Sequence, residues 1–125
     1  MKLEIEQSHL QTLLAKVIGA TAKKSLIPVL SNVKLIAGDS LQAVATDLDM
    51  EITASQPARV ESTGATTVNA SLLSGIVSKL PKGSLVSLSH DGDYLHVKAG
   101  RSKFKLATLP PEDFPVMASN EYTSS

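Results

Sequence analysis

Two stretches of this sequence place apolar residues at the spacing of an amphipathic helix. The first carries them at i, i+3, i+4, i+7 and i+8, and the second echoes most of that pattern: Leu10, Leu13, Leu14, Val17 and Ile18, then Leu72, Leu73, Ile76, Val77 and Leu80. Apolar residues at this spacing form one stripe along a helix, which is buried against a core. We therefore expect one helix in each half of the chain.

Local signals indicate where these helices begin and end. Ser8 precedes the first stripe as an N-cap, and Gln11 stands three residues later, at the spacing of a capping box. Gly19 is placed to stop the first helix. Pro81 ends the second, because proline cannot continue a helix.

Short apolar segments flank both stripes and predict strands. One strand precedes each helix and three follow it: residues 1–6, 29–36, 41–46 and 50–55 in the first half, then 66–68, 85–88, 94–99 and 102–108. Turns are expected at Gly38-Asp39 and at residues 90–93, and a bend at Gly100. This order predicts an α+β domain with an internal βαβββ duplication.

Length and composition limit the class of protein. The chain has 125 residues, which suits one compact domain, and a hydrophobic content of 42% is enough for a real core. The absence of cysteine excludes disulfides and thiolate metal sites. The N-terminus lacks the apolar run of a signal peptide, and no run approaches the ~20 apolar residues of a membrane span. We expect an intracellular protein that does not enter a membrane.

The charges are unevenly distributed, although their sum is zero. Zero net charge argues against tight independent binding of nucleic acid. Residues 7–38 hold four lysines and no acid, residues 39–51 hold four acids and no base, and residues 98–105 hold four bases and no acid. Local fields of both signs are therefore expected, with ordinary solvated surface as the simpler interpretation.

The acidic segment is a candidate for chemistry. Asp47, Asp49 and Glu51 would share one face of an extended strand, and hard cations favour carboxylate ligands. No further ligand set accompanies them, so we favour a turn ordered by bonds from Asp47 to backbone amides. A small metal-dependent hydrolase is the alternative. The three histidines form no recognisable triad motif, and no glycine-rich phosphate loop is present.

Two basic segments are candidates for binding. Lys23 and Lys24 precede the second expected strand, and a flexible lysine pair can meet phosphates without reading bases. Solubility is the simpler explanation for this pair. In residues 101–106, alternation places Phe104 and Leu106 on one face of a strand and the lysines on the other. Lysines also protect an edge strand from aggregation, and a basic edge that recruits an acidic partner is a further alternative.

The most distinctive segments of the chain are 25–32 (SLIPVLSN), 45–52 (ATDLDMEI) and 100–115 (GRSKFKLATLPPEDFP). Together they closely resemble the first domain of the bacterial DNA polymerase III β subunit family, the sliding clamps of replication. The resemblance implies a DNA-clamp fold, with a duplicated βαβββ unit, two helices on one side and antiparallel sheets outside. It also implies a clamp domain at residues 1–115 and the start of a linker into a second domain at 116–125.

The function that this resemblance implies is that of a processivity factor without catalytic residues, metal or cofactor. In the family, a homodimeric ring encircles duplex DNA without reading its sequence and tethers the replicative polymerase in the cytoplasm. Polymerase and exonuclease activities belong to the holoenzyme. The catalytic subunit and the clamp loader bind the clamp through later domains.

The resemblance also implies roles for particular residues. Lys24 occupies the position of a basic loop residue that touches DNA, with Lys23 beside it, and Lys79 is the charged residue on the exposed face of the second helix. The family residue in the loop is typically arginine, so lysine would weaken a bidentate grip to a point charge. The implied dimer interface is the last strand with flanking helix residues: Arg101, Lys103, Phe104, Lys105 and Leu106, with Leu73 and Val77. The basic residues would face an acidic partner surface.

Overall fold

The structure is a computed structural model that describes residues 1–20, 31–46 and 50–114. Within these ranges the helices are α1 (Gln7–Val17) and α2 (Ala70–Lys79), with short 3₁₀ turns at Ile18–Ala20 and Pro111–Asp113. The strands are β1 (Lys2–Glu6), β2 (Asn32–Ala37), β3 (Leu41–Thr46), β4 (Glu51–Gln56), β5 (Arg59–Ser62), β6 (Gly64–Asn69), β7 (Leu85–Asp91), β8 (Tyr94–Ala99) and β9 (Ser102–Leu109).

All neighbouring strands are antiparallel, in the order β4-β3-β2-β6-β9-β8-β7-β1-β5. The two halves of the chain exchange their first strands, because β1 pairs with β7 and β6 pairs with β2. β9 joins the halves, since residues 102–107 pair with β8 and the last two residues pair with β6. This arrangement confirms the α+β class and the βαβββ duplication.

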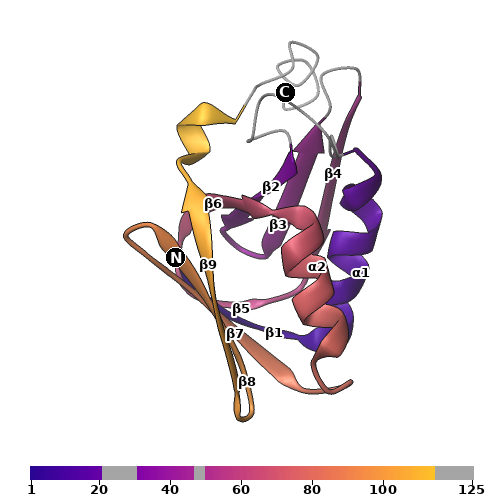
Figure 1. The fold of residues 1–125 in the computed structure, drawn as a ribbon, viewed down its shortest axis with the longest axis vertical. Coiled ribbons are helices and arrows are strands. Elements are labelled where there is room, and N and C mark those ends of the chain that lie inside the picture. The colour runs from indigo at the N-terminus through magenta and orange to yellow at the C-terminus, as the bar shows by residue number, and fades with distance from the viewer. Residues whose placement is uncertain (21–30, 47–49, 115–125) are drawn as a thin grey trace.

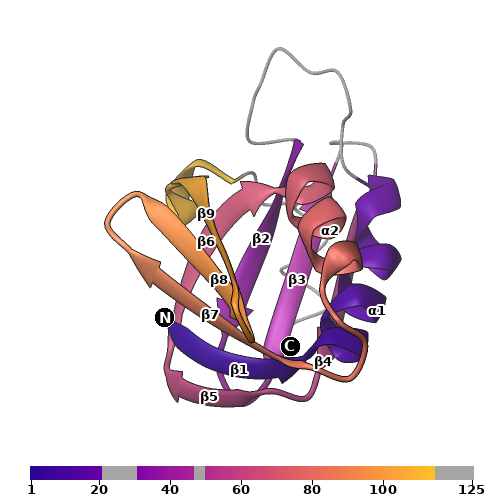
Figure 2. The same ribbon diagram turned by 60° about the horizontal axis from the view of Figure 1, so that its bottom comes forward.

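The two helices lie side by side on one side of the molecule, and the strands form the other layer (Figures 1 and 2). α1 packs over β3 and β4, whereas α2 packs over β2 and β6. One apolar cluster fills the space between helices and strands, and its largest fully buried members come from both halves: Leu3, Leu13, Leu35, Leu73, Leu88 and Leu95. The two βαβββ units of the chain therefore share one hydrophobic core.

A buried glutamine joins the two helices. Gln7 is 1% exposed, and its Nε2 donates to the carbonyl of Val77 at 2.9 Å. Its backbone N–H donates to the carbonyl of Ser84, also at 2.9 Å. Moving α1 away from α2 would break these bonds and leave buried polar groups unsatisfied, at a cost of about 1–3 kcal/mol each. The bonds therefore hold the start of α1 against the end of α2.

The start of α1 differs from the prediction. The helix begins at Gln7 with Glu6 as its N-cap and no side-chain hydrogen bond at the cap, so the predicted Ser8 capping box is wrong. The N–H of Gln7 is already satisfied from outside the helix by Ser84. A tertiary contact thus replaces the local cap at this end.

Two further differences from the prediction concern the start of the second helix and one additional strand. α2 begins at Ala70, and Asn69 caps it by accepting a hydrogen bond from the N–H of Leu72 at 2.9 Å. The strand β5 was not predicted. It is mostly exposed and polar, and it exists by pairing with the edge of β1.

Two tight turns bring β7, β8 and β9 together as predicted. Gly92, between β7 and β8, has φ 49°, and Gly100, between β8 and β9, has φ 59°. Both values lie in the left-handed region that glycine adopts readily. Arg101 is exposed beside Gly100. These turns determine which side chains lie next to one another across the three strands.

Candidate nucleic-acid and subunit interfaces

The helix side of the molecule presents a surface without acidic helix residues. Neither α1 nor α2 contains Asp or Glu. The exposed helix residues are mostly small, polar or basic: Ser8, Thr12, Ala15 and Lys16 on α1, and Ser71, Leu72, Gly75, Ser78 and Lys79 on α2. Lys82 is exposed shortly after α2 and, with Gln7 and Gln11, lines a shallow hollow of about 380 Å³. The exposed lysines on and beside the two helices are therefore Lys16, Lys79 and Lys82.

Lys79 is the one described member of the three lysines predicted to contact nucleic acid. It is exposed in the last turn of α2 and forms no ion pair within the described ranges. Lys23 and Lys24 lie outside the described residues, so their role stays a prediction.

β9 has an open edge over most of its length. Residues 102–107 pair with β8 on one side, and no strand in the described part of the chain pairs with them on the other. The end of the strand is held in place, because Thr67 Oγ1 donates to the carbonyl of Leu109 and the N–H of Thr108 donates to that of Asp93, both at 2.8 Å. A row of unpaired backbone groups on a fixed strand is a template for a further strand.

The two faces of β9 differ as alternation predicts. Lys103 and Lys105 are exposed, and Lys105 Nζ lies 4.3 Å from the centre of the Tyr94 ring. On the opposite face Phe104 is half-buried against the core, and Leu106 is only 4% exposed. Leu106 is thus already used by the chain's own core, whereas Phe104 keeps apolar surface that a partner could cover.

The apolar residues of α2 are divided between core and surface. Leu73 and Val77 are fully buried, so neither side chain offers surface to a second subunit in the chain as described. Leu72, by contrast, is 54% exposed, and Ile76 one turn later is half-buried. The buried line begins at Ala70 and continues at intervals of three and four residues, a spacing that separates it from the exposed pair.

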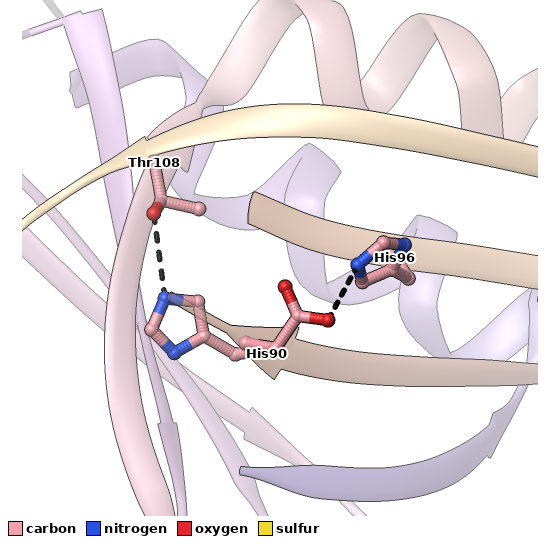
Figure 3. A network of polar contacts seen from close by, with 4 residues as sticks. His90, His96 and Thr108 are labelled. Atoms are coloured by element: carbon pink, nitrogen blue, oxygen red, sulfur yellow. Dashed lines mark hydrogen bonds and ion pairs between the residues drawn. The ribbon is translucent and has the colours of Figure 1, made fainter. Parts of the chain in front are cut away.

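Two histidine contacts lie close to the β7–β8 hairpin (Figure 3). His96 Nε2 is 2.9 Å from Asp91 Oδ2, and His90 Nε2 is 3.3 Å from Thr108 Oγ1. A catalytic triad requires the hydroxyl and the carboxylate to contact the same imidazole. Here they contact different rings, so the geometry of these pairs is that of two separate polar contacts.

The acidic segment is only partly described. Glu51 is half-buried at the start of β4, and Asp47 and Asp49 lie outside the described residues. Among the residues that are described, no group of His, Asp and Glu side chains could hold a metal ion. Neither helix of the described chain has the length and apolarity needed to cross a membrane.

Comparison with known sequences gives one consistent family. The model of the DNA polymerase III beta subunit N-terminal domain matches residues 1–118. The beta sliding clamp of Caulobacter vibrioides is 46% identical over 127 residues, covering 99% of this chain and 34% of the relative. That of Escherichia coli K12 is 38% identical over 118 residues, covering 92% of this chain and 32% of the relative.

Solved structures give the same result. The DNA polymerase sliding clamp from Caulobacter crescentus matches with a TM-score of 0.92 at 47% identity, covering 96% of this chain and 33% of that one. The DNA polymerase III subunit beta from Pseudomonas aeruginosa matches with a TM-score of 0.90 at 36% identity, covering 94% and 32%. The chain thus spans about a third of the length of the relatives it matches.

Proposed function

Because the chain belongs to the DNA polymerase III beta subunit family, as its N-terminal domain, we propose that it is the first domain of a sliding clamp. In this proposal residues 1–115 form the domain, and residues 116–125 lead into a second one. Two full-length subunits close a ring around duplex DNA in the cytoplasm. The ring makes and breaks no covalent bond, and it raises processivity by tethering the replicative polymerase.

The acid-free helix surface is the observation that carries this proposal. Duplex DNA bears one negative charge for each ~1.7 Å of its axis, and every phosphate that a protein neutralises adds a salt-dependent term to its affinity. A helix pair that lacks Asp and Glu does not repel such a duplex. Because exposed lysines such as Lys16, Lys79 and Lys82 are few, the surface would also leave the duplex free to slide.

The open edge of β9 supports the proposal of ring closure. A strand of the second subunit could continue the sheet along residues 102–107, covering Phe104. Arg101, Lys103 and Lys105 are exposed beside this edge, so an acidic partner surface would complement it. The exposed Leu72 on α2 offers further apolar area, in place of the buried Leu73 and Val77.

The other proposed partners bind outside this chain. We assign contact with the polymerase catalytic subunit and the clamp loader to later domains of the full-length protein. The described residues then serve closure of the ring and passage of the duplex.

The test of the proposal is topological. The full-length protein is loaded by its clamp loader onto nicked circular DNA, and half of the sample is then linearised. We expect retention on circles and loss from linear ends, because encirclement, unlike affinity, fails at a free end. Equal retention on both forms would mean ordinary binding. Loss from both would leave a module that recruits an acidic partner through a basic edge.

Replacing Lys23 and Lys24 together with alanine should weaken DNA contact by the full-length protein. Each phosphate contact contributes about 0.9 to the slope of log affinity against log salt, so we expect the slope to become shallower by about 1–2 units. The measurement is a salt titration of binding to a short duplex. The matched control is Lys2→Ala with Lys98→Ala, which removes the same charge from the strand layer. An unchanged slope in the loop variant would refute the role of the loop.

A further inference from the structure

On the outer face of the strands, four residues of neighbouring strands form a row in which a serine separates an acidic residue from two basic ones. The register places Glu4 of β1, Ser87 of β7, Lys98 of β8 and Lys103 of β9 side by side. Neighbouring strands lie ~4.8 Å apart, so Ser87 keeps the backbone positions of Glu4 and Lys98 about 10 Å apart. Glu4, Lys98 and Lys103 form no ion pair within the described residues, and Arg59 of β5 lies opposite Glu4 on the other side of β1.

In the adjacent row the two long side chains beside Ser89 each contact a carboxylate. Ser89 lies between Lys2 and His96 in the register. Lys2 Nζ is 3.6 Å from Glu61, and His96 Nε2 is 2.9 Å from Asp91. Among the described residues of the two rows, the bases without a carboxylate partner are Lys98, Lys103 and Lys105, and the last of these lies opposite His96 in the register.

The two serines lie within a hollow on this face. The hollow has a volume of about 360 Å³, and Ser87 and Ser89 are lined up between longer side chains that include Glu4 on one side and Lys98 on the other. Short residues between long ones leave room for side chains of another molecule. The hollow is thus polar and has an acidic and a basic wall.

The basic wall is unfavourable for the isolated chain. Lys98 lies directly opposite Lys103 across the β8–β9 ladder, and like charges in that position are destabilising. Arg101 is exposed in the turn that joins the two strands. These charges lack counter-ions among the described residues, so an anionic partner would be attracted to them.

We propose that this outer hollow binds an extended, acidic segment of a partner protein. Carboxylates of the segment meet Lys98 and Lys103, and its neutral or basic side chains lie over Ser87 towards Glu4. A nucleic acid fits less well, because a continuous chain of phosphates crossing the hollow would meet Glu4, whereas a peptide can place neutral side chains there. The proposal goes beyond the ring, because the hollow itself is lined from β1, β5, β7 and β8, whereas Lys103 of β9 borders both the hollow and the open edge.

The experiment uses anisotropy to measure binding of a fluorescent peptide to the chain, and the peptide has alternating Asp and Thr in one half and only neutral Ser and Thr in the other. Lys98→Glu should weaken binding about tenfold, because one attraction is lost and a repulsion replaces it. The same change exchanges a like-charge pair with Lys103 for an opposite one, so the fold is not weakened. Ser87→Leu, which fills the hollow without changing charge, should also weaken binding several-fold.

Lys79→Glu is the matched control, because it makes the same charge change on the helix side, and its effect should stay within about twofold. Equal weakening by Lys79→Glu and Lys98→Glu would reduce the effect to net charge and overturn the proposal. Absence of peptide binding at low salt would overturn it as well. Tighter binding of oligothymidylate than of the peptide, with the same sensitivity to Lys98→Glu, would assign the hollow to nucleic acid instead.

Discussion

Replacing Leu73 with alanine is expected to lower the free energy of unfolding of this chain by about 2–5 kcal/mol, the range for replacing a buried leucine with alanine and leaving a cavity. Leu73 is fully buried in the cluster that both halves of the duplication share. Its loss therefore acts on the fold itself and not on contact with a second subunit. Urea denaturation of the chain, followed by circular dichroism, measures the change.

Leu72→Ala is the matched control for this prediction. The same chemical change is made at the neighbouring position, where the side chain is 54% exposed, and surface changes of this kind are usually worth no more than about 0.5 kcal/mol. In the full-length protein we expect the reverse ranking for subunit affinity, because Leu72 and not Leu73 offers surface to a partner. Equal destabilisation of the chain by both variants would contradict the division of α2 into a buried and an exposed line.

The comparison of these two leucines shows what the sequence could and could not predict. Apolar spacing predicted α2, and glycines at positions 92 and 100 predicted the hairpins, because both signals are local. The stripe could not separate Leu72 from Leu73, since which edge of a stripe is covered depends on the strands packed against it. Those strands come from both halves of the chain.

Long-range contacts account for the other differences. β5 has a mostly exposed, polar sequence that no periodicity rule selects, and it is a strand because β1 offers it an edge. Ser8 was expected to cap α1, but the carbonyl of Ser84 satisfies the first N–H from the other half of the chain. Helices and strands could thus be predicted where residues close in the sequence determine them, and not where a distant strand or carbonyl does.

The same distinction holds for the sites. The run of bases at residues 98–105 is visible in the sequence, and alternation correctly placed Lys103 and Phe104 on opposite faces of β9. The pairing of Lys98 with Lys103, and the serine that separates Lys98 from Glu4, depend on the register of four strands. The tight turns at Gly92 and Gly100 set the pairing of β7, β8 and β9, but no local pattern specifies the pairing of β1 with β7 that brings in Glu4.

Phe104→Asp in the full-length protein should shift the dimer strongly towards monomer. Phe104 is half-buried on the core side of an open edge, and a strand added there would cover the rest of it. A carboxylate in that position would be buried without a partner, at a cost of about 3–5 kcal/mol. The dissociation constant of the dimer should rise by about two to four orders of magnitude for each of the two junctions in the ring, which sedimentation velocity over a dilution series can measure.

Two controls separate the interface from the fold. Phe104→Leu keeps an apolar side chain, so the dimer should weaken by less than about tenfold. Ser55→Asp adds the same charge at an exposed position of β4, four strands from β9 in the sheet order, and should leave the dimer unchanged. Because Phe104 also packs against the core, circular dichroism must show that the aspartate variant is folded. A folded Phe104→Asp protein with native dimer affinity would place ring closure on a surface other than β9.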